Sequence, residues 1–263
     1  MAETPSLQTG GGRRPRSPTR LVTVEAVEPV TPRLTRVTFG GDQLAGFGPP
    51  RPGAHMKLLF VPEGARWSPE DESAPRPPRR TYTPRRYDPE TNTLEVEFVH
   101  HGDGLAAVWA QSARPGDALF ITGPGGGYDV PDDATEIVLV ADDTALPAAG
   151  TILEALPTGC RATVLCEIAA AAEERPLSPH VASSPVWLHR GSVVAGTLLE
   201  AAVRDLTPAS PDACWWIACE AAAMRRIRRH LLRERGVDVS RIHTRGYWKL
   251  GETAYPDHDY GKD

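Results

Sequence analysis

The pattern of apolar and polar positions changes near the middle of the chain. Between residues 21 and 124, short stretches alternate apolar with polar residues, and Pro, Gly, Asp or Asn bound each of them. Alternation with a period of two is typical of a strand with one buried face. Five such stretches, LVTVEAVE, LTRVTFGG, HMKLLFVPE, TLEVEFVHH and DALFITGP, therefore predict a small antiparallel β-barrel or sandwich.

Unbroken apolar runs replace this alternation after the turn-forming segment VPDDAT. The runs are EIVLVADD, RATVLCEIA, SPVWLHR and ACWWIACE, and the helical stretches among them are TALPAAGTILEAL, GTLLEAAVRDL and AAAMRRIRRHLLRER. Strands that are buried on both faces and joined by crossover helices form a parallel sheet. The predicted fold class is therefore β followed by α/β.

The change of pattern suggests two domains. We expect an antiparallel β domain over residues 19–130 and an α/β domain over residues 131–263, since the chain exceeds the usual size of a single domain. Residues 1–18 carry no hydrophobic period and are rich in Gly, Pro, Arg, Ser and Thr, so a flexible tail is predicted there. The proline-rich stretch EGARWSPEDESAPRPPRR is expected to be an exposed excursion.

Composition and charge narrow the classes of function. The formal net charge of -5 gives no general attraction for nucleic acid or anionic lipid. No run approaches the roughly 18 apolar residues of a membrane-spanning helix, and the N-terminal residues lack the apolar core of a secretory signal. The four cysteines form no CxxC pair, so buried thiols are expected and a metal site is not. We expect a cytoplasmic protein with no nucleic-acid partner and no membrane insertion.

The first stretch with chemical content is RTYTPRR, which begins at Arg80. A flavin site needs an aromatic face for the isoalloxazine ring, a small hydroxyl near its redox-active edge and a guanidinium for the diphosphate. Tyr82, Thr83 and Arg80 supply all three within four residues. By itself the stretch fits equally well with a β-strand that carries ordinary surface arginines.

A glycine-containing turn, HHGDG, precedes the short helical stretch LAAVWA. Free N–H groups at a helix start suit a diphosphate, and Gly102 and Gly104 would let it approach closely. The alternative is a simple connection from strand to helix with a buried Trp109.

The turn after the run EIVLVADD lies where a dinucleotide-binding unit places its glycine-rich loop, but no G-x-G-x-x-G occurs there. Asp142 and Asp143 stand in its place, followed by Thr144 and Ala145. Two carboxylates would repel a diphosphate at a helix start, so nicotinamide nucleotide binding must be modified, weak or differently oriented. Asp143 or Thr144 is also expected to be the N-cap of the helix.

Six arginines follow the run ACWWIACE on one predicted helix, and a solvated face accounts for most of them. Arg225, Arg228 and Arg229 share one side of that helix by their spacing, near Glu220 at its start. That side would bind an anionic ligand if it faces a cleft. A side that faces solvent would not support such a function.

Two lysines lie in short motifs, Lys57 in HMKLLF and Lys249 in RGYWKLG. We expect them to converge on one cleft, where they would position an anionic ligand. An outward-facing lysine on a half-buried strand is an equally compatible reading of Lys57.

The order of six motifs resembles that of the siderophore-interacting protein family, from about Thr19 to Gly251: RTYTPRR, HHGDGLAAVWAQSARPGD, GPGGGYDV, VADDTALPA, CEAAAMRRIRRHL and RGYWKLG. The resemblance implies a ferredoxin-reductase-like fold, in which an N-terminal FAD-binding β-barrel precedes a C-terminal NAD(P)-binding-like domain. It also implies that Arg80 contacts the FAD diphosphate, Tyr82 the flavin ring and Thr83 the N5 side.

The resemblance assigns further residues to ligands. The turn and the helix after it would hold the rest of the diphosphate and the adenosine, through His101, Gly102, Gly104, Ala107 and Trp109. The family often shows Pro and Ser where this chain has Leu105 and Ala107, and the missing hydroxyl puts one phosphate hydrogen bond in doubt. The cofactor-binding residues expected in the second domain are Asp142, Thr144, Ala145 and Glu220. The residues expected to bind a ferric siderophore are Lys57, Arg229 and Lys249, and the C-terminal segment of the second domain, which carries Lys249, is expected to line the substrate cleft.

The reaction implied by the resemblance is electron transfer from NADPH or NADH through FAD to Fe(III) in a siderophore, with release of Fe(II) for iron acquisition. FAD suits this reaction because it accepts two electrons together and releases them singly. One alternative is a less selective flavin or ferric-chelate reductase. Another is a protein that binds flavin or an iron chelate without turnover, and reduced ferredoxin is an alternative donor.

Overall fold

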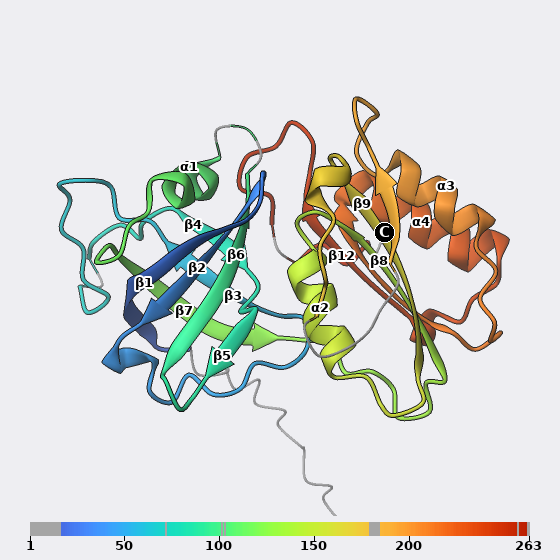
Figure 1. Cartoon of the computed structure of the whole chain (residues 1–263), viewed down its shortest axis with the longest axis horizontal. Helices are drawn as coiled ribbons and strands as arrows, with labels where there is room; N and C mark the ends of the chain where they lie inside the picture. The colour runs from blue at the N-terminus through green and yellow to red at the C-terminus, as the bar shows by residue number, and fades with distance from the viewer. Residues whose placement is uncertain are drawn as a thin grey trace, which may run out of the picture.

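A computed structural model describes residues 17–71, 73–100, 102, 104–178, 185–256 and 258–261. In it the chain forms two β-sheets side by side, the first coloured from blue to green and the second from light green to red in Figure 1. The tail predicted for residues 1–18 lies outside the described residues, apart from Ser17 and Pro18.

The first sheet is antiparallel and, within the described residues, has seven strands in the order β4-β3-β7-β1-β2-β6-β5. The strands are β1 (Thr19–Thr31), β2 (Leu34–Gly40), β3 (Ala54–Leu59), β4 (Arg79–Tyr82), β5 (Arg86–Asp88), β6 (Thr93–Val99) and β7 (Ala118–Gly126). Alternate side chains form the core beneath this sheet, for example Val37 and Phe39 on β2. The five alternating stretches of the sequence are confirmed as β1, β2, β3, β6 and β7.

The second sheet is parallel and has the order β10-β9-β8-β11-β12 in the described part of the chain. Its strands are β8 (Glu136–Asp142), β9 (Arg161–Ile168), β10 (Val186–His189), β11 (Cys214–Glu220) and β12 (Ile242–Trp248). Every residue of β8 and β11 is buried, which explains why their apolar runs are unbroken. The predicted fold class, an antiparallel β part followed by a parallel α/β part, is confirmed.

Helices cover both faces of the second sheet. They are α2 (Leu146–Glu154), α3 (Thr197–Asp205) and α4 (Ala221–Arg229), whereas α1 (Leu105–Ser112) belongs to the first half of the chain. Leu139 of β8 packs in one core cluster with α2, and its neighbour Val140 packs in another with α3 and α4. In Figure 1, α2 lies on the side of the second sheet that faces the first sheet.

Short helical turns complete the described elements. They are the 3-10 turns η1 (Asp42–Leu44), η2 (Ala171–Glu173) and η4 (Val239–Arg241), and the π-helical turn η3 (His230–Glu234), which extends α4. The expectation that Asp143 or Thr144 caps α2 is wrong. Ala145 is the N-cap of α2 and makes no side-chain cap, because the Thr144 hydroxyl hydrogen-bonds Asp142 at 2.6 Å instead.

A segment of the second half reaches across to the first sheet. We call residues 171–177 the bridging segment. Its Glu173 carboxylate accepts hydrogen bonds from the Thr31 hydroxyl and the Arg33 N–H. Its Arg175 guanidinium lies 3.4 Å from the buried carboxylate of Glu97 on β6. These contacts, together with α2, fix the seam at which the two sheets meet.

Two further expectations concerned buried cysteine thiols and membrane-spanning helices. All four cysteines are free, with Cys160 partly exposed and Cys166, Cys214 and Cys219 buried. Among the residues that the structure describes, no helix is long and apolar enough to span a membrane.

Candidate active site

A cavity of about 770 Å³ opens at the seam between the two sheets. Both halves of the chain line it: β3 and β4 with the start of α1 on one side, and the loop between β8 and α2 with the end of β12 on the other. The chain beyond β12 lines it as well, from Gly251 to Pro256. Its volume is in the range of ligand pockets, about 300–1,000 Å³.

The β4 wall of the cavity carries the motif RTYTPRR. Arg80, Tyr82 and Thr83 all line the cavity. The Tyr82 ring packs on Phe98 with 4.6 Å between ring centroids, and burial raises the pKa of its phenol. Tyr82 therefore presents a neutral aromatic surface that is fixed from behind.

Tyr247 of β12 faces this wall from the second half of the chain. It lines the same cavity, and its phenol hydrogen-bonds the side chain of Thr83. Burial raises the pKa of Tyr247 to about 12, although this hydrogen bond opposes the shift. Two uncharged aromatic residues from different sheets thus line one cavity, and the one on β12 hydrogen-bonds Thr83.

The start of α1 forms another part of the wall. Gly104 and Ala107 line the cavity, and Gly104 is the N-cap of α1 without a side-chain cap. Small residues at an uncapped helix start leave backbone N–H groups for an anion. Trp109 is not among the lining residues and packs in the core against Phe98, with 5.6 Å between ring centroids. Gly102 is exposed and does not line the cavity, and His101 lies outside the described residues.

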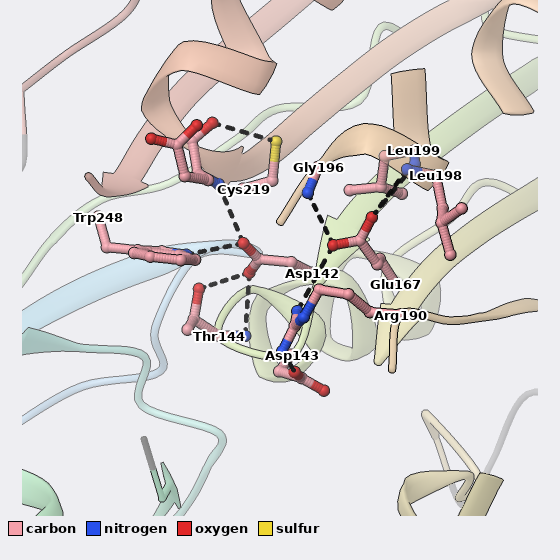
Figure 2. Close-up of polar contacts among 11 residues, drawn as sticks. Asp142, Asp143, Thr144, Glu167, Arg190, Gly196, Leu198, Leu199, Cys219 and Trp248 are labelled. Atoms are coloured by element: carbon pink, nitrogen blue, oxygen red, sulfur yellow. Dashed lines mark hydrogen bonds and ion pairs between the residues drawn. The ribbon is translucent and has the colours of Figure 1, made fainter. Parts of the chain in front are cut away.

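The carboxyl ends of the neighbouring strands β9, β8 and β11 carry buried carboxylates, of which Figure 2 labels Asp142 and Glu167. Asp142 on β8 accepts hydrogen bonds from the Thr144 N–H at 3.0 Å, the Glu220 N–H at 2.9 Å and the Trp248 indole at 2.8 Å. Its oxygens are therefore used inside the protein, and Asp142 does not line the cavity. The contact with Trp248 instead fixes the end of β12, where the chain enters the cavity wall.

The other two carboxylates lie at helix starts. Glu220 on β11 caps α4 by accepting from the Ala223 N–H at 2.9 Å and also accepts from the Leu250 N–H at 3.3 Å. Glu167 on β9 accepts from the Gly196 N–H at 2.7 Å and from two further N–H groups at the start of α3. At these helix starts a carboxylate of the chain already takes the place that a phosphate would occupy.

Asp143 lies beside these carboxylates but points toward Arg190, which bridges it to Glu167 (Figure 2). The guanidinium lies 3.4 Å from the Asp143 carboxylate. Burial and the charge of Asp142 nevertheless raise the pKa of Asp143 to about 6. The next residue, Thr144, lines the cavity, and Ala145 is fully buried behind it.

Two of the three predicted substrate-binding cations line the cavity. Lys57 on β3 donates to the Thr81 hydroxyl at 2.6 Å. Lys249, directly after β12, forms an ion pair with Glu252. Arg229 is exposed at the end of α4 and is not among the lining residues, so the structure does not bring it to the two lysines.

Two family models match consecutive parts of the chain. The first describes a siderophore-interacting FAD-binding domain and matches residues 23–128, and the second describes a siderophore-interacting protein and matches residues 134–251. The chain belongs to the siderophore-interacting proteins. The resemblance seen in the six motifs is thereby confirmed.

Known proteins similar to this siderophore-interacting protein agree with that assignment. The crystal structure of a siderophore utilization protein from T. fusca is 36% identical, covers 92% of this chain and 96% of its own, and has a TM-score of 0.81. The ferric vibriobactin reductase ViuB of Vibrio cholerae is 29% identical over 88% of this chain and 89% of its own. The NADPH-dependent ferric-chelate reductase of Escherichia coli is 36% identical over 52% of this chain and 57% of its own.

More distant structures share the fold alone. Phthalate dioxygenase reductase is 15% identical and has a TM-score of 0.60, with 86% of this chain and 67% of that chain covered. This similarity confirms the ferredoxin-reductase-like fold class.

The residues of the cavity fit FAD, the cofactor named by the matching domain model. Tyr82 offers an aromatic face, Thr83 a hydroxyl beside it, and Arg80 a guanidinium. The uncapped start of α1 adds backbone N–H groups. Ala107 provides no hydroxyl there, so backbone groups and arginines are the donors left for the diphosphate.

Sequence reasoning placed Lys249 and its C-terminal segment at the cleft of this siderophore-interacting protein, but it did not name three further residues of that segment as lining it. Tyr247, Trp248 and Glu252 all line the cavity. The bulky aromatic pair directly before Lys249 was the sequence feature that could have indicated these lining residues. The return of the chain over the cavity after Gly251 left no comparable pattern in the sequence.

Proposed function

We propose that this siderophore-interacting protein reduces Fe(III) bound in an anionic siderophore, with a reduced nicotinamide as electron donor. The observation that carries the proposal is that one cavity is lined both by the aromatic residue Tyr82 and by the cations Lys57 and Lys249. A flavin and an iron chelate would therefore meet in the same space. The names of the reductases among its relatives support this reaction.

The residues of the chain would act by binding and orienting. FAD supplies the redox chemistry when bound, since it accepts two electrons from a nicotinamide and releases them one at a time. Tyr82 would support one face of the flavin ring, and Tyr247 would limit access from the other side. Thr83 would place a hydroxyl at the edge of the ring, and Arg80 would bind the diphosphate.

The substrate would be held by charge. Lys57 lies on β3 of the first sheet and Lys249 directly after β12 of the second, and they would contact an anionic chelate from two sides. Their long side chains suit a recognition by charge more than by shape. After reduction the chelate would release its metal, because oxygen donors hold Fe(II) less tightly than the more highly charged Fe(III).

The donor would have to bind differently from a nucleotide in an ordinary dinucleotide-binding domain. Glu167 and Glu220 use the N–H groups at the starts of α3 and α4, so these helices would offer little to a diphosphate. Asp142 and Glu220 therefore act as positioning residues for the cavity wall in this proposal. A nicotinamide that enters the cavity near Thr144 would be held mainly through contacts of its ring, and less through its diphosphate.

The experiment is reduction of the FAD-loaded protein with NADPH, NADH or reduced ferredoxin under anaerobic conditions. Bleaching of the flavin by a nicotinamide, followed by formation of Fe(II) in a ferrous trap when a ferric siderophore is added, is the expected result. Fe(II) formation driven by ferredoxin alone would reject the nicotinamide donor. Bleaching without Fe(II) would reject the reductase, and no bleaching with any donor would favour a binding protein.

Two variants test the substrate site. Lys57→Ala and Lys249→Ala should each raise the KM for an anionic ferric siderophore about tenfold while kcat changes less, since a charge contact within the cavity supports binding and not the transfer itself. Arg229→Ala is the matched control, because it removes an exposed cation that does not line the cavity. Unchanged KM values in both lysine variants would reject the proposal that Lys57 and Lys249 bind the substrate.

A further inference from the structure

The chain beyond β12 is held in place over the cavity. We call residues 251–256 the C-terminal loop. Behind it, Gly246 of β12 donates its N–H to the Asp259 carbonyl at 2.8 Å, so the returning chain pairs with the strand that it left. A Cβ atom on Gly246 would lie 2.7 Å from the Asp259 carboxylate and 3.0 Å from the Ala221 Cβ, so a larger residue would crowd both neighbours. The loop is therefore closed at both ends.

The Asp259 side chain fixes one residue of the loop. Its carboxylate accepts a hydrogen bond from the Tyr255 hydroxyl at 2.6 Å and forms an ion pair with Arg225 at 2.8 Å. The Tyr255 ring in turn faces Lys249, with 6.0 Å between the Lys249 Nζ and the ring centroid. The aromatic ring thus gives the ammonium group of Lys249 a second partner beside the cavity.

Glu252 of the C-terminal loop forms an ion pair with the same lysine. The side chains of Lys249 and Glu252 are 41% and 47% exposed, so water and a ligand can reach both partners. Glu252 therefore differs from Glu97, the other carboxylate that lines the cavity among the described residues. Glu97 is buried and bound from behind by Arg36 at 2.7 Å and Arg175 at 3.4 Å.

An anionic ligand that approaches Lys249 thus meets a carboxylate already bound there. Glu252 repels the ligand and competes for the same ammonium group. A neutral ligand does not compete for the ammonium and gains nothing when Glu252 leaves. Selectivity between chelates of different charge would then depend on one side chain of the C-terminal loop.

We infer that Glu252 is a specificity-determining residue that occupies Lys249 in place of an anionic iron chelate and weakens the binding of such chelates relative to neutral ones. This inference rests on the proposed function only in the choice of ligand. It assigns to Glu252 a role opposite to that of the lysine: the lysine attracts the substrate, and the carboxylate sets how much negative charge is accepted.

The test is Glu252→Gln, measured as the ratio of KM for a triply negative ferric tris-catecholate to KM for a neutral ferric tris-hydroxamate. An exposed ion pair is worth up to about 1 kcal/mol, which corresponds to about a fivefold change in binding. We therefore expect the ratio to fall about three- to fivefold in the variant. A ratio within about 1.5-fold of the wild-type value would overturn the inference.

Two controls separate this role from a general effect of charge. Glu90→Gln removes one exposed carboxylate on the turn between β5 and β6 and should leave the ratio unchanged. In a Lys249→Ala background, Glu252→Gln should lower the ratio less than in the wild type, because the competition requires the lysine and only the direct repulsion remains. An effect of Glu252→Gln that is undiminished without Lys249, or that Glu90→Gln reproduces, would count against the inference.

A binding measurement keeps this test apart from that of the reductase. Ga(III) matches Fe(III) in charge and is not readily reduced, so calorimetric titration with the gallium tris-catecholate reports binding without electron transfer. Glu252→Gln should lower its Kd about three- to fivefold. If it does, the inference stands even for a protein that reduces no iron. An unchanged Kd in a protein that does reduce iron would reject the inference alone.

Discussion

Most substitutions at buried positions destabilise a protein, but we predict that a substitution of Asp143 stabilises this one. Burial and the neighbouring Asp142 raise the pKa of the Asp143 carboxyl from 3.8 to about 6. A carboxyl whose pKa is raised on folding favours the folded state most at low pH, and this contribution is lost as pH rises from about 4 through 6. Asp143→Asn replaces the carboxyl by a neutral side chain of the same shape and should therefore stabilise the protein at neutral pH.

The magnitude follows from the two pKa values, 3.8 in the unfolded chain and about 6 in the folded one. Relative to a side chain that does not titrate, the raised pKa of Asp143 costs the folded state about 3 kcal/mol at pH 7.5 and about 1.6 kcal/mol at pH 5. The variant also loses the ion pair with Arg190 at 3.4 Å, although Arg190 keeps Glu167 at 3.5 Å. The attraction of Arg190 lowers the pKa of Asp143, so it is already contained in the pKa of about 6 and is not subtracted again. The gain in stability should thus be about 1.4 kcal/mol larger at pH 7.5 than at pH 5.

Urea unfolding of the FAD-loaded protein, followed by tryptophan fluorescence at pH 5 and pH 7.5, measures this difference. The exposed Asp132, on the turn before β8, provides the control, and Asp132→Asn should leave the free energy of unfolding within about 0.5 kcal/mol of wild type at both pH values. The reasoning would be refuted by a gain of equal size at both pH values, or by one that is larger at pH 5.

Three further predictions concern single side chains. Gly246→Ala should lower the free energy of unfolding by about 1–3 kcal/mol in urea titrations, because the new methyl group would crowd the Asp259 carboxylate; no loss would show that the returning chain shifts freely. Glu167→Gln should cost about 1–3 kcal/mol in the same assay, since an amide cannot accept all three N–H groups at the start of α3. Tyr82→Ala should raise the Kd for FAD about tenfold or more in a fluorescence titration, whereas Tyr82→Phe should retain the affinity; equal affinity in both variants would remove the ring from the site.

Most of the fold could be predicted because the burial of a strand determines its pattern of apolar and polar residues. Alternation marked the strands with one exposed face, and unbroken apolar runs marked β8 and β11, whose residues are all buried. The short strands β4 and β5, with four and three residues, are too brief for a period to appear. β12 was missed as a strand because its sequence, IHTRGYW, mixes polar and aromatic residues where it borders the cavity. The domain border near residues 130 and 131 stays a prediction.

The candidate site was predictable where a residue type has one obvious chemical use. An aromatic residue, a hydroxyl and a guanidinium next to one another indicated the wall that Tyr82 forms, and the two lysines do line one cavity. Asp142 and Glu220 could not be assigned in this way. A carboxylate near a helix start can face a ligand or accept internal N–H groups, and only the folded chain shows which donors reach it. Their roles as cofactor ligands remain predictions that the internal hydrogen bonds do not favour.

The bridging segment has a consequence for how this protein can be dissected. Its Arg175 belongs to the second half of the chain, yet it neutralises the buried Glu97 of the first half. A fragment that ends near residue 130 would keep Arg36 beside Glu97 but lose the second cation, and the wall of the cavity would lose its support. The two halves are thus linked by an ion pair between Arg175 and Glu97. Recombining the FAD-binding half with the second half of a relative should succeed only when the relative supplies a cation at the position of Arg175.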